Sequence, residues 1–415
     1  MQIRCAVRLR SQRAEDRARF WSILQKMSQR TTYEYEPKTP EKIEPFTERI
    51  TEEGLDHVVS LIQESKRPYI FVGGGSIISG ASEEVRELAH RIQAPVCDTL
   101  MGKGAFPGTD ELYTGMLGMH GTKTSNYGVT KCDLLIVLGA RFSDRVTGNA
   151  AKFANNAKIV QIDVDAAEIN KNVVVESSII GDVKEVLKRL NAKLEPMHHD
   201  EWIAEIEAMK EKFPLKHEEG LTGPFVIEEI YKATNGEAII TTDVGQHQMW
   251  AAQYYRYTSP RTLLTSGGLG TMGFGLPAAI GATFGRPDRT VCVFMGDGGL
   301  QMNIQELGTI MEQKAPVKII LLNNNYLGNV RQWQAMFFGH RYSFTPMLNP
   351  DYMKIAEAYE IPARRVMKRE ELQAAIHEML TTDGPFLLEA CVIEEGNVLP
   401  MTPPGGSVNQ MLLEC

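Results

Sequence analysis

The chain contains 415 residues, of which 43% are hydrophobic and 23% are charged, and its formal net charge at pH 7 is -8. This length and composition are typical of a globular protein with two or three domains, and the negative charge argues against a nucleic-acid surface. No apolar run is long enough to span a membrane and no signal peptide with an apolar centre opens the chain, so we expect a cytoplasmic protein. The six cysteines include no CxxC pair and do not cluster with histidines, which indicates neither a disulfide framework nor a zinc site.

The first part of the chain is polar. Residues 1–30 are rich in arginine and lack a convincing hydrophobic period, which is typical of a disordered basic arm or a transit-like leader. Residues 31–53 contain three prolines and many charges, and these predict an extended linker.

Apolar periodicity starts at residue 54 and alternates between helical and strand patterns. Helices are predicted at 56–65 and 82–93, a strand with a glycine turn at 67–76, and further strands at 94–99, 134–138 and 159–164. This alternation predicts an open α/β sheet whose ligands lie beyond the carboxyl ends of the strands. Glycine-rich or polar loops occur at 73–75, 99–102, 115–122, 139–148, 161–165 and 181–183. Each loop alone is typical of a turn.

A polar segment, 193–223, separates this pattern from a second one, and we expect it to be a helix flanked by linker. Its adjacent His198 and His199 indicate solvated side chains rather than a metal site, because no third ligand with suitable spacing is near. The second pattern begins at Pro224, and its first strand, EAIITTDVG, is followed by a polar loop that either faces a ligand or is simply capped by a histidine.

The stretch from Val291 to Gln334 is the most informative. An apolar run, VCVFMG, predicts a buried strand that ends in Gly-Asp-Gly at 296–298, and a helical pattern and a second apolar run, VKIILL, lead to Asn323 and Asn324. Both strand ends meet at one edge of a parallel sheet, so Asp297 and Asn324 can converge on a hard cation such as Mg²⁺. The glycines allow phosphate oxygens to approach backbone N–H groups. Gly-Asp-Gly by itself is also an ordinary turn.

The spacing in this stretch resembles a known signature. Twenty-four residues separate Gly298 from Asn323, as in the diphosphate-binding motif of thiamine-diphosphate enzymes. Residues 241–275 and the sequence LGNVRQWQ at 327–334 resemble the catalytic subunit of acetohydroxyacid synthase, also called acetolactate synthase. The resemblance covers residue 28 to the C-terminus. It implies two α/β domains with open, mainly parallel sheets flanked by helices: a central FAD-binding domain at 54–192 and a thiamine-diphosphate-binding domain at 224–398, with residues 399–415 as a tail over the active site.

The resemblance also implies site residues and their roles. Gln246 and His247 would donate to the cofactor diphosphate, while the Gly270 carbonyl and the Met272 amide would grip its aminopyrimidine; without the resemblance, Met272 would be a core residue. The full set for thiamine diphosphate is Val244, Gly245, Gln246, His247, Gly270, Met272, Gly296, Gly298, Gly299 and Asn324. The predicted Mg²⁺ ligands are Asp297, Asn324 and the backbone carbonyl of Tyr326.

Two further groups of residues follow from the resemblance. The residues predicted to contact FAD are Gly73, Gly74, Gly75, Thr99, Leu100, Met101, Met119, His120, Gly139, Arg141, Asp144, Arg145, Asp163, Asp182 and Val183. Arg331 and Trp333 would line the substrate channel, although without the resemblance a tryptophan in this context is more typical of a packing anchor.

The chain departs from the family pattern at several places. Lys103 stands where the family commonly has an apolar residue, Asn329 where it has methionine, and Asn325-Tyr326 where it often has Gln-His. The family's activating glutamate belongs to an N-terminal pyrimidine-binding domain, and no stretch of this chain matches it. Plausible codons for residues 16–28, translated in another frame, can encode the end of that domain, so we interpret residues 1–30 as a frame-shifted remnant.

These observations predict an acetolactate synthase catalytic subunit. The family decarboxylates pyruvate on thiamine diphosphate and ligates the hydroxyethyl group to pyruvate or 2-ketobutyrate, the first common step of branched-chain amino acid biosynthesis, as a homodimer or tetramer with a small regulatory subunit in some members. We expect little or no synthase activity from this chain alone. Two alternatives stay open: another thiamine-diphosphate enzyme, of the glyoxylate carboligase or pyruvate oxidase type, and a non-catalytic FAD-binding or assembly module.

Overall fold

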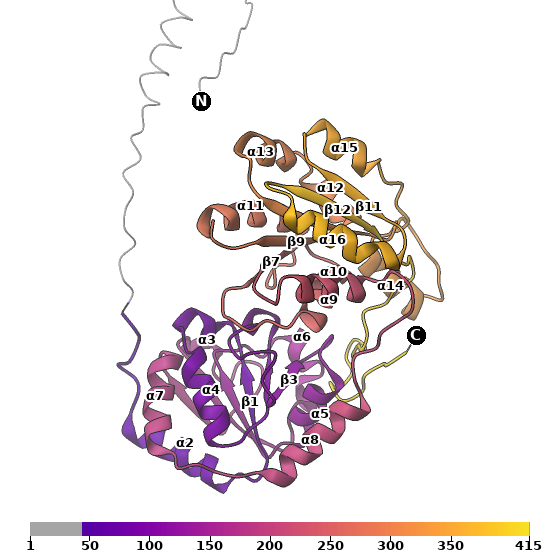
Figure 1. Cartoon of the computed structure of the whole chain (residues 1–415). Coiled ribbons are helices and arrows are strands. Elements are labelled where there is room, and N and C mark those ends of the chain that lie inside the picture. The colour runs from indigo at the N-terminus through magenta and orange to yellow at the C-terminus, as the bar shows by residue number, and fades with distance from the viewer. Residues whose placement is uncertain (1–43, 415) are drawn as a thin grey trace, which may run out of the picture. The chain divides into compact units, whose positions relative to one another are not determined.

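Two six-stranded sheets, each built only from parallel strand pairs, form the framework of the protein (Figure 1). The structure is a computed structural model that describes residues 44–414. The prediction of two α/β domains with open parallel sheets is confirmed. The hypothesis of a frame-shifted remnant and most of the predicted linker lie outside the described residues.

The first sheet has the strand order β3-β2-β1-β4-β5-β6. Its central strands are short apolar runs buried along their whole length, as expected for a parallel sheet covered on both faces. The strands are β1 (Pro68–Val72), β2 (Val96–Asp98), β3 (Tyr113–Met116), β4 (Leu134–Leu138), β5 (Lys158–Asp163) and β6 (Ser177–Ile180). The helices of this domain are α2 (Glu52–Glu64), α3 (Gly74–Ser79), α4 (Ser82–Arg91), α5 (Lys123–Lys131), α6 (Asp144–Thr147), α7 (Val183–Lys193) and α8 (Asp200–Lys212), with short 3-10 turns η1 (Leu100–Gly102), η2 (Ala150–Lys152) and η3 (Ala166–Glu168).

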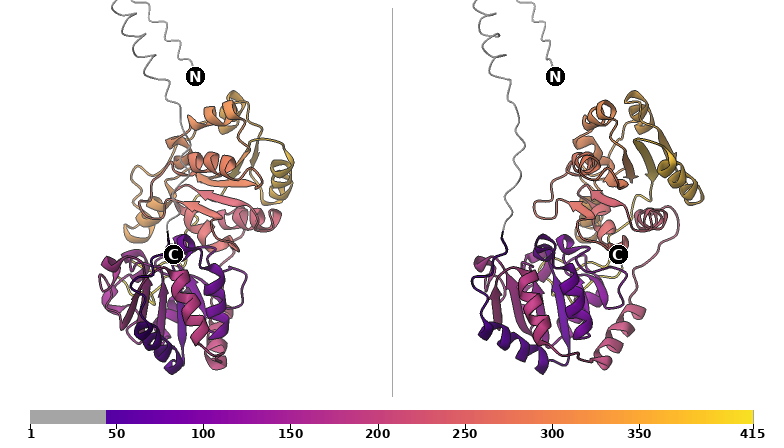
Figure 2. Two further views of the ribbon diagram at one scale, coloured as in Figure 1. Left: turned by 90° about the vertical axis from the view of Figure 1, so that its left-hand side faces the viewer. Right: turned by 60° about the vertical axis from the view of Figure 1, so that its left-hand side comes forward.

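Helices cover both faces of the first sheet (Figure 2). Alternate residues of β1 point to opposite faces and pack against these two helix layers. Ile70 and Val72 pack in a core cluster with residues of α2, α4 and α7. Tyr69 and Phe71 pack in a second cluster with Trp202 of α8 and with α5. Each fully buried aliphatic or aromatic side chain of this kind contributes roughly 1.5–3 kcal/mol.

The second sheet has the order β11-β12-β10-β9-β7-β8 and is covered in the same way. Its strands are β7 (Ile239–Thr242), β8 (Leu263–Thr265), β9 (Val291–Gly296), β10 (Val317–Asn323), β11 (Ala363–Val366) and β12 (Phe386–Cys391). One face is packed by α9 (Gly223–Ala233), α10 (Gln246–Tyr254) and α16 (Leu372–Thr381), and the other by α11 (Gly275–Gly285), α13 (Glu306–Gln313) and α15 (Tyr352–Ala358). The remaining elements are α12 (Asp297–Met302), α14 (Gly328–Phe337) and the 3-10 turn η4 (Arg369–Glu371).

The segment after β12 returns to the first domain (Figure 1). The Thr402 amide donates to the Met119 carbonyl at 2.8 Å, and the Asn149 amide donates to the Gly406 carbonyl at 3.0 Å. Val408 is 1% exposed and belongs to the core cluster that contains Trp202. The C-terminal residues therefore complete the packing of the first domain.

Among the helices of residues 44–414, none combines the length and the apolar character that a membrane crossing requires.

Candidate functional site

The strand order of the second sheet creates a crevice at one edge. The chain passes from β7 to β8 on one side, and β9 then lies on the other side of β7. The connections after β7 and β9 therefore leave the sheet in opposite directions, which is where open α/β sheets bind ligands. Val244 and Gly245 follow β7 at this point, and Asp297 and Gly298 follow β9.

A cavity lies at this crevice. It is lined by these residues of the sets predicted for thiamine diphosphate and Mg²⁺: Val244, Gly245, Gln246, His247, Met272, Gly296, Asp297, Gly298, Gly299, Asn324 and Tyr326. The other lining residues are Trp250, Leu322, Leu327, Gly328, Asn329, Val330 and Val392. Gly270 of the predicted set is not part of the lining, and no residue of the C-terminal tail is either.

Asp243 holds the loops around the cavity together, although the sequence analysis did not single it out. Its carboxylate is fully buried and accepts from the backbone amides of Val244 at 2.6 Å, Gly273 at 2.9 Å and Gly275 at 3.3 Å. A Cβ atom at Gly299 would lie 2.9 Å from this carboxylate, so the glycine there is required by close packing. The signal that could have identified Asp243 is an acidic residue directly after a buried strand.

Asp297 is oriented by two donors. The Gly298 amide donates to its Oδ1 at 3.0 Å, and Asn349 Nδ2 donates to its Oδ2 at 2.8 Å. Burial raises the pKa of Asp297 above its ordinary value, because the ionised carboxylate loses its hydration. A cation beside this carboxylate would offset that cost.

Asn324 and Tyr326 supply the other oxygens that a cation could use. Asn324 Oδ1 accepts from the Tyr326 amide at 3.3 Å, which leaves one lone pair of this oxygen for a metal. Within residues 44–414, no group of three or more His, Cys, Asp or Glu side chains forms a metal site. A cation here would thus combine one carboxylate with amide and carbonyl oxygens, a donor set that suits Mg²⁺.

His247 presents an unsatisfied polar atom at the cavity. Burial lowers its pKa to about 4, so the ring is neutral at pH 7. Its Nε2 is buried and has no hydrogen-bond partner among the described residues. Gln246, by contrast, already donates from Nε2 to the Gln332 side chain at 2.9 Å and to the Gly396 carbonyl at 2.8 Å. The residues present therefore fit a phosphate group best at His247.

Arg331 and Trp333, predicted to line a substrate channel, lie outside the lining of the cavity. Arg331 is 1% exposed and donates to the Asn397 side chain at 2.9 Å and to the Gly396 carbonyl. Trp333 is half-buried and packs against Phe337 with ring centroids 5.2 Å apart. In this structure Arg331 links α14 to the segment at Gly396 and Asn397, whereas Trp333 packs against a residue of α14 itself.

The residues predicted for FAD lie along the carboxyl edge of the first sheet, which also has a switch point. In the order β3-β2-β1-β4-β5-β6, the connections after β1 and β4 diverge, as in dinucleotide-binding folds. Gly73 follows β1 and Gly139 follows β4, and a Cβ atom at Gly73 would lie 2.2 Å from the Gly139 carbonyl oxygen. The Gly75 amide donates to the same carbonyl at 2.9 Å. These glycines allow the two turns to touch.

Met119, His120 and Arg145 form one group beside this edge. The Met119 amide donates to the Arg145 carbonyl at 2.8 Å, and Arg145 Nη1 lies 3.9 Å from Met119 Sδ. Burial and, to a lesser degree, the charge of Arg145 lower the pKa of His120 to about 4, and its Nδ1 has no partner among the described residues. Arg141 and Asp144, which lie close to Arg145 in the sequence, are exposed. Unpaired polar groups and exposed arginines at a switch point fit an anionic dinucleotide.

Other members of the predicted FAD set have local structural roles. Asp182 caps α7 by accepting from the Glu185 amide at 3.2 Å, and Val183 starts that helix. Asp163 accepts from the Asp165 amide at 3.0 Å. Thr99 caps η1, the turn that contains Leu100 and Met101, and a Cβ atom at Gly74 would lie 3.2 Å from Met101 Cβ.

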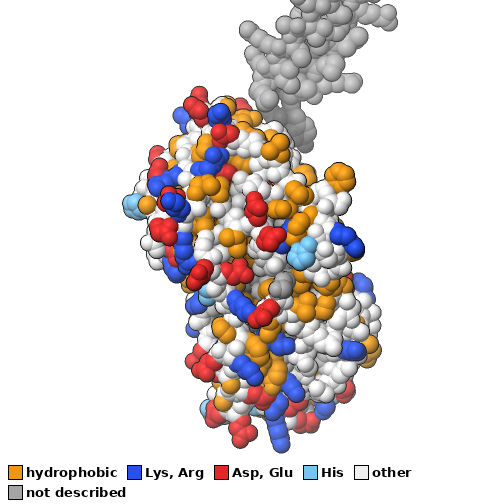
Figure 3. All heavy atoms as spheres, turned by 90° about the vertical axis from the view of Figure 1, so that its right-hand side faces the viewer, with side chains coloured by type: hydrophobic (Ala, Val, Ile, Leu, Met, Phe, Trp, Pro, Cys, Tyr) orange, Lys and Arg blue, Asp and Glu red, His pale blue; other side chains and the backbone are white. Residues whose placement is uncertain are grey.

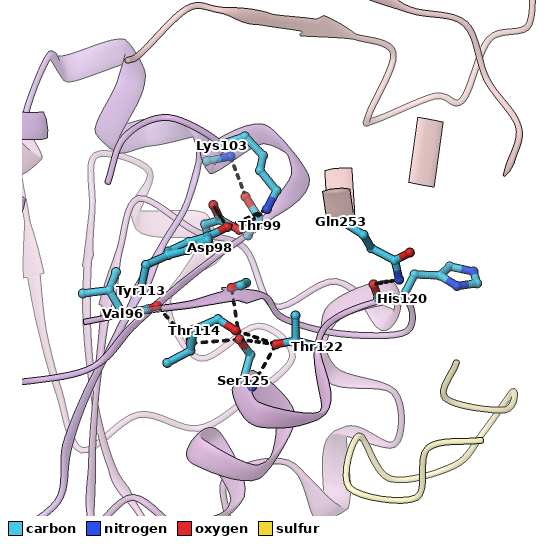
Figure 4. A network of polar contacts seen from close by, with 12 residues as sticks. Val96, Asp98, Thr99, Lys103, Tyr113, Thr114, His120, Thr122, Ser125 and Gln253 are labelled. Carbon is cyan, nitrogen blue, oxygen red and sulfur yellow. Dashed lines mark hydrogen bonds and ion pairs between the residues drawn. The ribbon is translucent and has the colours of Figure 1, made fainter. Parts of the chain in front are cut away.

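Lys103, which departs from the family pattern, is neutralised within the first domain (Figure 4). Its Nζ lies 3.1 Å from Asp98 Oδ1 and donates to the Tyr113 hydroxyl at 2.6 Å, and this hydroxyl donates to Asp98 Oδ2 at 2.9 Å. Asp98 and Lys103 are 1% and 5% exposed. The lysine charge is therefore paired inside the protein rather than directed at the predicted flavin site.

The two adjacent histidines form no metal site. His199 is half-buried, with Nδ1 2.7 Å from the Ile92 carbonyl oxygen and Nε2 3.2 Å from the Ser65 carbonyl oxygen. His199 thus fixes the start of α8 through backbone carbonyls, so the prediction of a solvated side chain is wrong for His199, while His198 is exposed as predicted.

Comparison with known proteins gives two family matches. Residues 55–190 match the central domain of thiamine pyrophosphate enzymes, and residues 243–390 match their C-terminal TPP-binding domain.

Individual relatives are similar over most of this chain. "Acetolactate synthase 2, chloroplastic" of Nicotiana tabacum is 48% identical over 377 residues, which are 87% of this chain and 56% of that protein. "Acetolactate synthase 1, chloroplastic" of Zea mays is 47% identical over 87% of this chain and 59% of its own length. A probable acetolactate synthase large subunit of Methanocaldococcus jannaschii is 46% identical over 86% of this chain and 63% of its own length. The chain thus spans somewhat more than half the length of these relatives.

Proposed function

Because the chain belongs to the thiamine pyrophosphate enzymes and is a homologue of the acetolactate synthases, we propose that its second domain binds thiamine diphosphate with Mg²⁺ for acetolactate synthesis. The observation that carries this proposal is the cavity at the β7/β9 switch point. Asp297 and Asn324 line it together with the unpartnered Nε2 of His247.

Each residue has a role in this proposal. Asp297, Asn324 and the Tyr326 carbonyl would hold Mg²⁺, and His247 Nε2 and the Gly299 amide would bind the diphosphate, because the Gly298 amide already donates to Asp297. The neutral imidazole can donate one hydrogen bond without adding charge to the site. When bound, thiamine diphosphate supplies a nucleophilic carbon and an electron sink for the decarboxylation of a 2-keto acid. Apolar lining residues, among them Val244, Met272 and Val392, would exclude water from the reacting groups.

The substrates and the second cofactor are part of the same proposal. Pyruvate would be decarboxylated, and the remaining two-carbon unit would be joined to a second pyruvate or to 2-ketobutyrate. FAD would lie along the carboxyl edge of the first sheet, where Arg141 and Arg145 are exposed to pair with its pyrophosphate.

The lining of the cavity bears on whether this chain works alone. Asp297 is the carboxylate among the lining residues, and no glutamate is among them. Asp297 is proposed as a Mg²⁺ ligand, and its two oxygens also accept hydrogen bonds, so it is not assigned to the activation of the pyrimidine. We propose that a partner chain or a further domain supplies that carboxylate.

The protein also has exposed apolar side chains to which a second protein chain can bind. The face shown in Figure 3 has hydrophobic side chains among charged ones of both signs. Phe344 and Leu348, after α14, are 98% and 100% exposed. Apolar exposure of this kind supports an oligomer, and we propose a cytoplasmic homodimer or tetramer that also binds a regulatory subunit. The plant relatives are described as chloroplastic, so fluorescence microscopy of the tagged chain would test the compartment.

The test begins with binding and proceeds to turnover. Quenching of tryptophan fluorescence by thiamine diphosphate should require Mg²⁺ in the wild-type chain and should be lost in Asp297→Ala. The exposed Asp288→Ala variant is the matched control and should behave as wild type. With pyruvate and FAD added, we expect little acetolactate from the chain alone and turnover from a fusion that carries the N-terminal part of a relative.

Four outcomes would contradict parts of this proposal. Failure of the wild-type chain to bind the cofactor would overturn the assignment of the cavity. Robust acetolactate formation by the chain alone would show that it supplies its own activating carboxylate. Cofactor binding without turnover in either form would favour the non-catalytic cofactor-binding module, whereas turnover with glyoxylate in place of pyruvate would favour a different carboligase.

A further inference from the structure

Asn349 makes hydrogen bonds to the ends of two neighbouring strands. It lies between α14 and α15, and its Nδ2 is 2.8 Å from Asp297 Oδ2, 3.0 Å from Asn323 Oδ1 and 3.2 Å from Asn325 Oδ1. Asp297 follows β9, whereas Asn323 is the last residue of β10. One side-chain amide therefore connects the carboxyl ends of both strands.

The orientation of this amide is set by its surroundings. An ionised carboxylate can only accept hydrogen bonds, so the nitrogen of Asn349 must face Asp297. The oxygen of Asn349 accepts from Gln301 Nε2 at 3.0 Å and from the Tyr352 hydroxyl at 3.2 Å. The same hydroxyl lies 3.2 Å from the Asp297 carbonyl oxygen. Both ends of the Asn349 amide are thus satisfied in one rotamer only.

Asn323 is held from its other side as well. Its Nδ2 donates to Glu389 Oε1 at 2.8 Å, and Glu389 Oε2 accepts from Arg365 Nε at 2.6 Å. Asn323 Oδ1 also accepts from the Asn325 amide at 3.1 Å, which closes a tight turn around the intervening Asn324. Asn325 has a positive φ of 56°, which asparagine tolerates better than most residues do.

We propose that Asn349 is a positioning residue for the cation site and fixes Asp297 and Asn324 relative to each other. This inference rests on the proposed function, since it concerns the same Mg²⁺ site. Asn349 does not line the cavity, so it acts through Asp297 and through the residues that flank Asn324. Groups that orient metal ligands in this way change metal affinity by about 10–100-fold when they are removed.

The experiment measures Mn²⁺ binding by electron paramagnetic resonance in the presence of thiamine diphosphate. Asn349→Ala should raise the Mn²⁺ dissociation constant by about 10–100-fold. Asn349→Asp should raise it at least as much, because a second carboxylate then faces Asp297 in place of a donor. Met367→Ala, just after β11, is the matched control, since that side chain is 63% exposed, and it should leave the constant unchanged.

A second variant and a second readout separate positioning from general destabilisation. Tyr352→Phe removes the hydroxyl that orients Asn349 while keeping the buried ring, so it should weaken Mn²⁺ binding to a smaller extent and fold normally. Thermal unfolding without metal reports the structural contribution. Loss of stability in the variants with an unchanged Mn²⁺ dissociation constant would overturn the inference and leave the proposed function standing. A wild-type chain that binds no Mn²⁺ with the cofactor present would overturn both.

Discussion

Gly328 lies so close to two residues of the cavity that any side chain at this position would collide with them. A Cβ atom there would lie 2.1 Å from Gln246 Oε1 and 2.8 Å from Asn324 Nδ2. These atoms are the ends of side chains, so the backbone can stay where it is while the side chains move. Movement of Gln246 would break its hydrogen bonds to Gln332 and Gly396, and movement of Asn324 would displace a proposed metal ligand.

We therefore predict that Gly328→Ala folds but binds Mg²⁺ and thiamine diphosphate at least 10-fold more weakly, as measured by quenching of tryptophan fluorescence. The matched control is Gly281→Ala in α11, where a Cβ atom meets nothing within 4 Å. Gly281→Ala should leave binding unchanged and stabilise the helix by roughly 0.5–1 kcal/mol. Equal binding by the two variants would show that Gln246 and Asn324 can move without harm to the site.

Chain order alone identified site residues at strand ends, whereas Met272, which lies between β8 and α11, was identified from the family resemblance. Asp297 and Asn324 follow two apolar runs, so a parallel sheet brings them to one edge, and the structure has both in one cavity. Asn349 also lies at this edge of the sheet, but it belongs to the connection between α14 and α15, whose sequence has no helical or strand periodicity. Its position therefore becomes known only from the structure. The ion pair of Lys103 and Asp98 escaped sequence reasoning for a related reason, because the residues lie on either side of η1 and meet only when that turn forms.

At the scale of elements, the two switch points explain where the predicted cofactor residues gather. Long apolar runs such as β1, β4, β9 and β10 could be predicted from sequence because both faces are buried. Short edge strands such as β6, β8 and β11 carry polar or half-exposed residues and give no such signal. The strand order, which locates the switch points, depends on long-range pairing and does not follow from periodicity.

The β1/β4 switch point yields a prediction for flavin binding. Arg141 follows β4 and is exposed, and no hydrogen bond or ion pair fixes its guanidinium among the described residues. A charge-assisted hydrogen bond to pyrophosphate contributes roughly 1.5–3 kcal/mol, so Arg141→Ala should weaken FAD binding by about 10–100-fold. Titration of flavin fluorescence measures this.

The free energy of unfolding distinguishes a direct loss of FAD binding from a loss of folding in Arg141→Ala. Arg141→Ala should change the free energy of unfolding by no more than about 0.5 kcal/mol, as expected for an exposed side chain. Arg189→Ala, on the exposed side of α7, is the control and should affect neither quantity. FAD affinity that is the same in both variants would argue against a pyrophosphate beside Arg141.

For the whole molecule, the C-terminal segment is one of the structural links between the second domain and the first. Besides the contacts of Thr402 and Gly406, the Asn126 side chain donates to the Val408 carbonyl at 2.9 Å, and Lys123 Nζ donates to the Asn409 carbonyl at 2.7 Å. The Gln253 side chain of α10 donates to the carbonyls of both His120 and Leu399 at 3.0 and 3.3 Å. The segment thus lies beside the His120 loop, so its docking can affect the proposed flavin site as well as stability.

Val408 tests this link directly. Its side chain is buried in the core of the first domain, so Val408→Ala should lower the free energy of unfolding by roughly 1–3 kcal/mol, through lost apolar burial and a residual cavity. Urea unfolding followed by circular dichroism measures the change, and Asn409→Ala, with an exposed side chain, should stay within about 0.5 kcal/mol of wild type. An unchanged midpoint for Val408→Ala would mean that the segment is undocked in solution. If unfolding shows two transitions and Val408→Ala lowers the midpoint of only one, the domains unfold separately and the segment stabilises only the domain that unfolds in that transition.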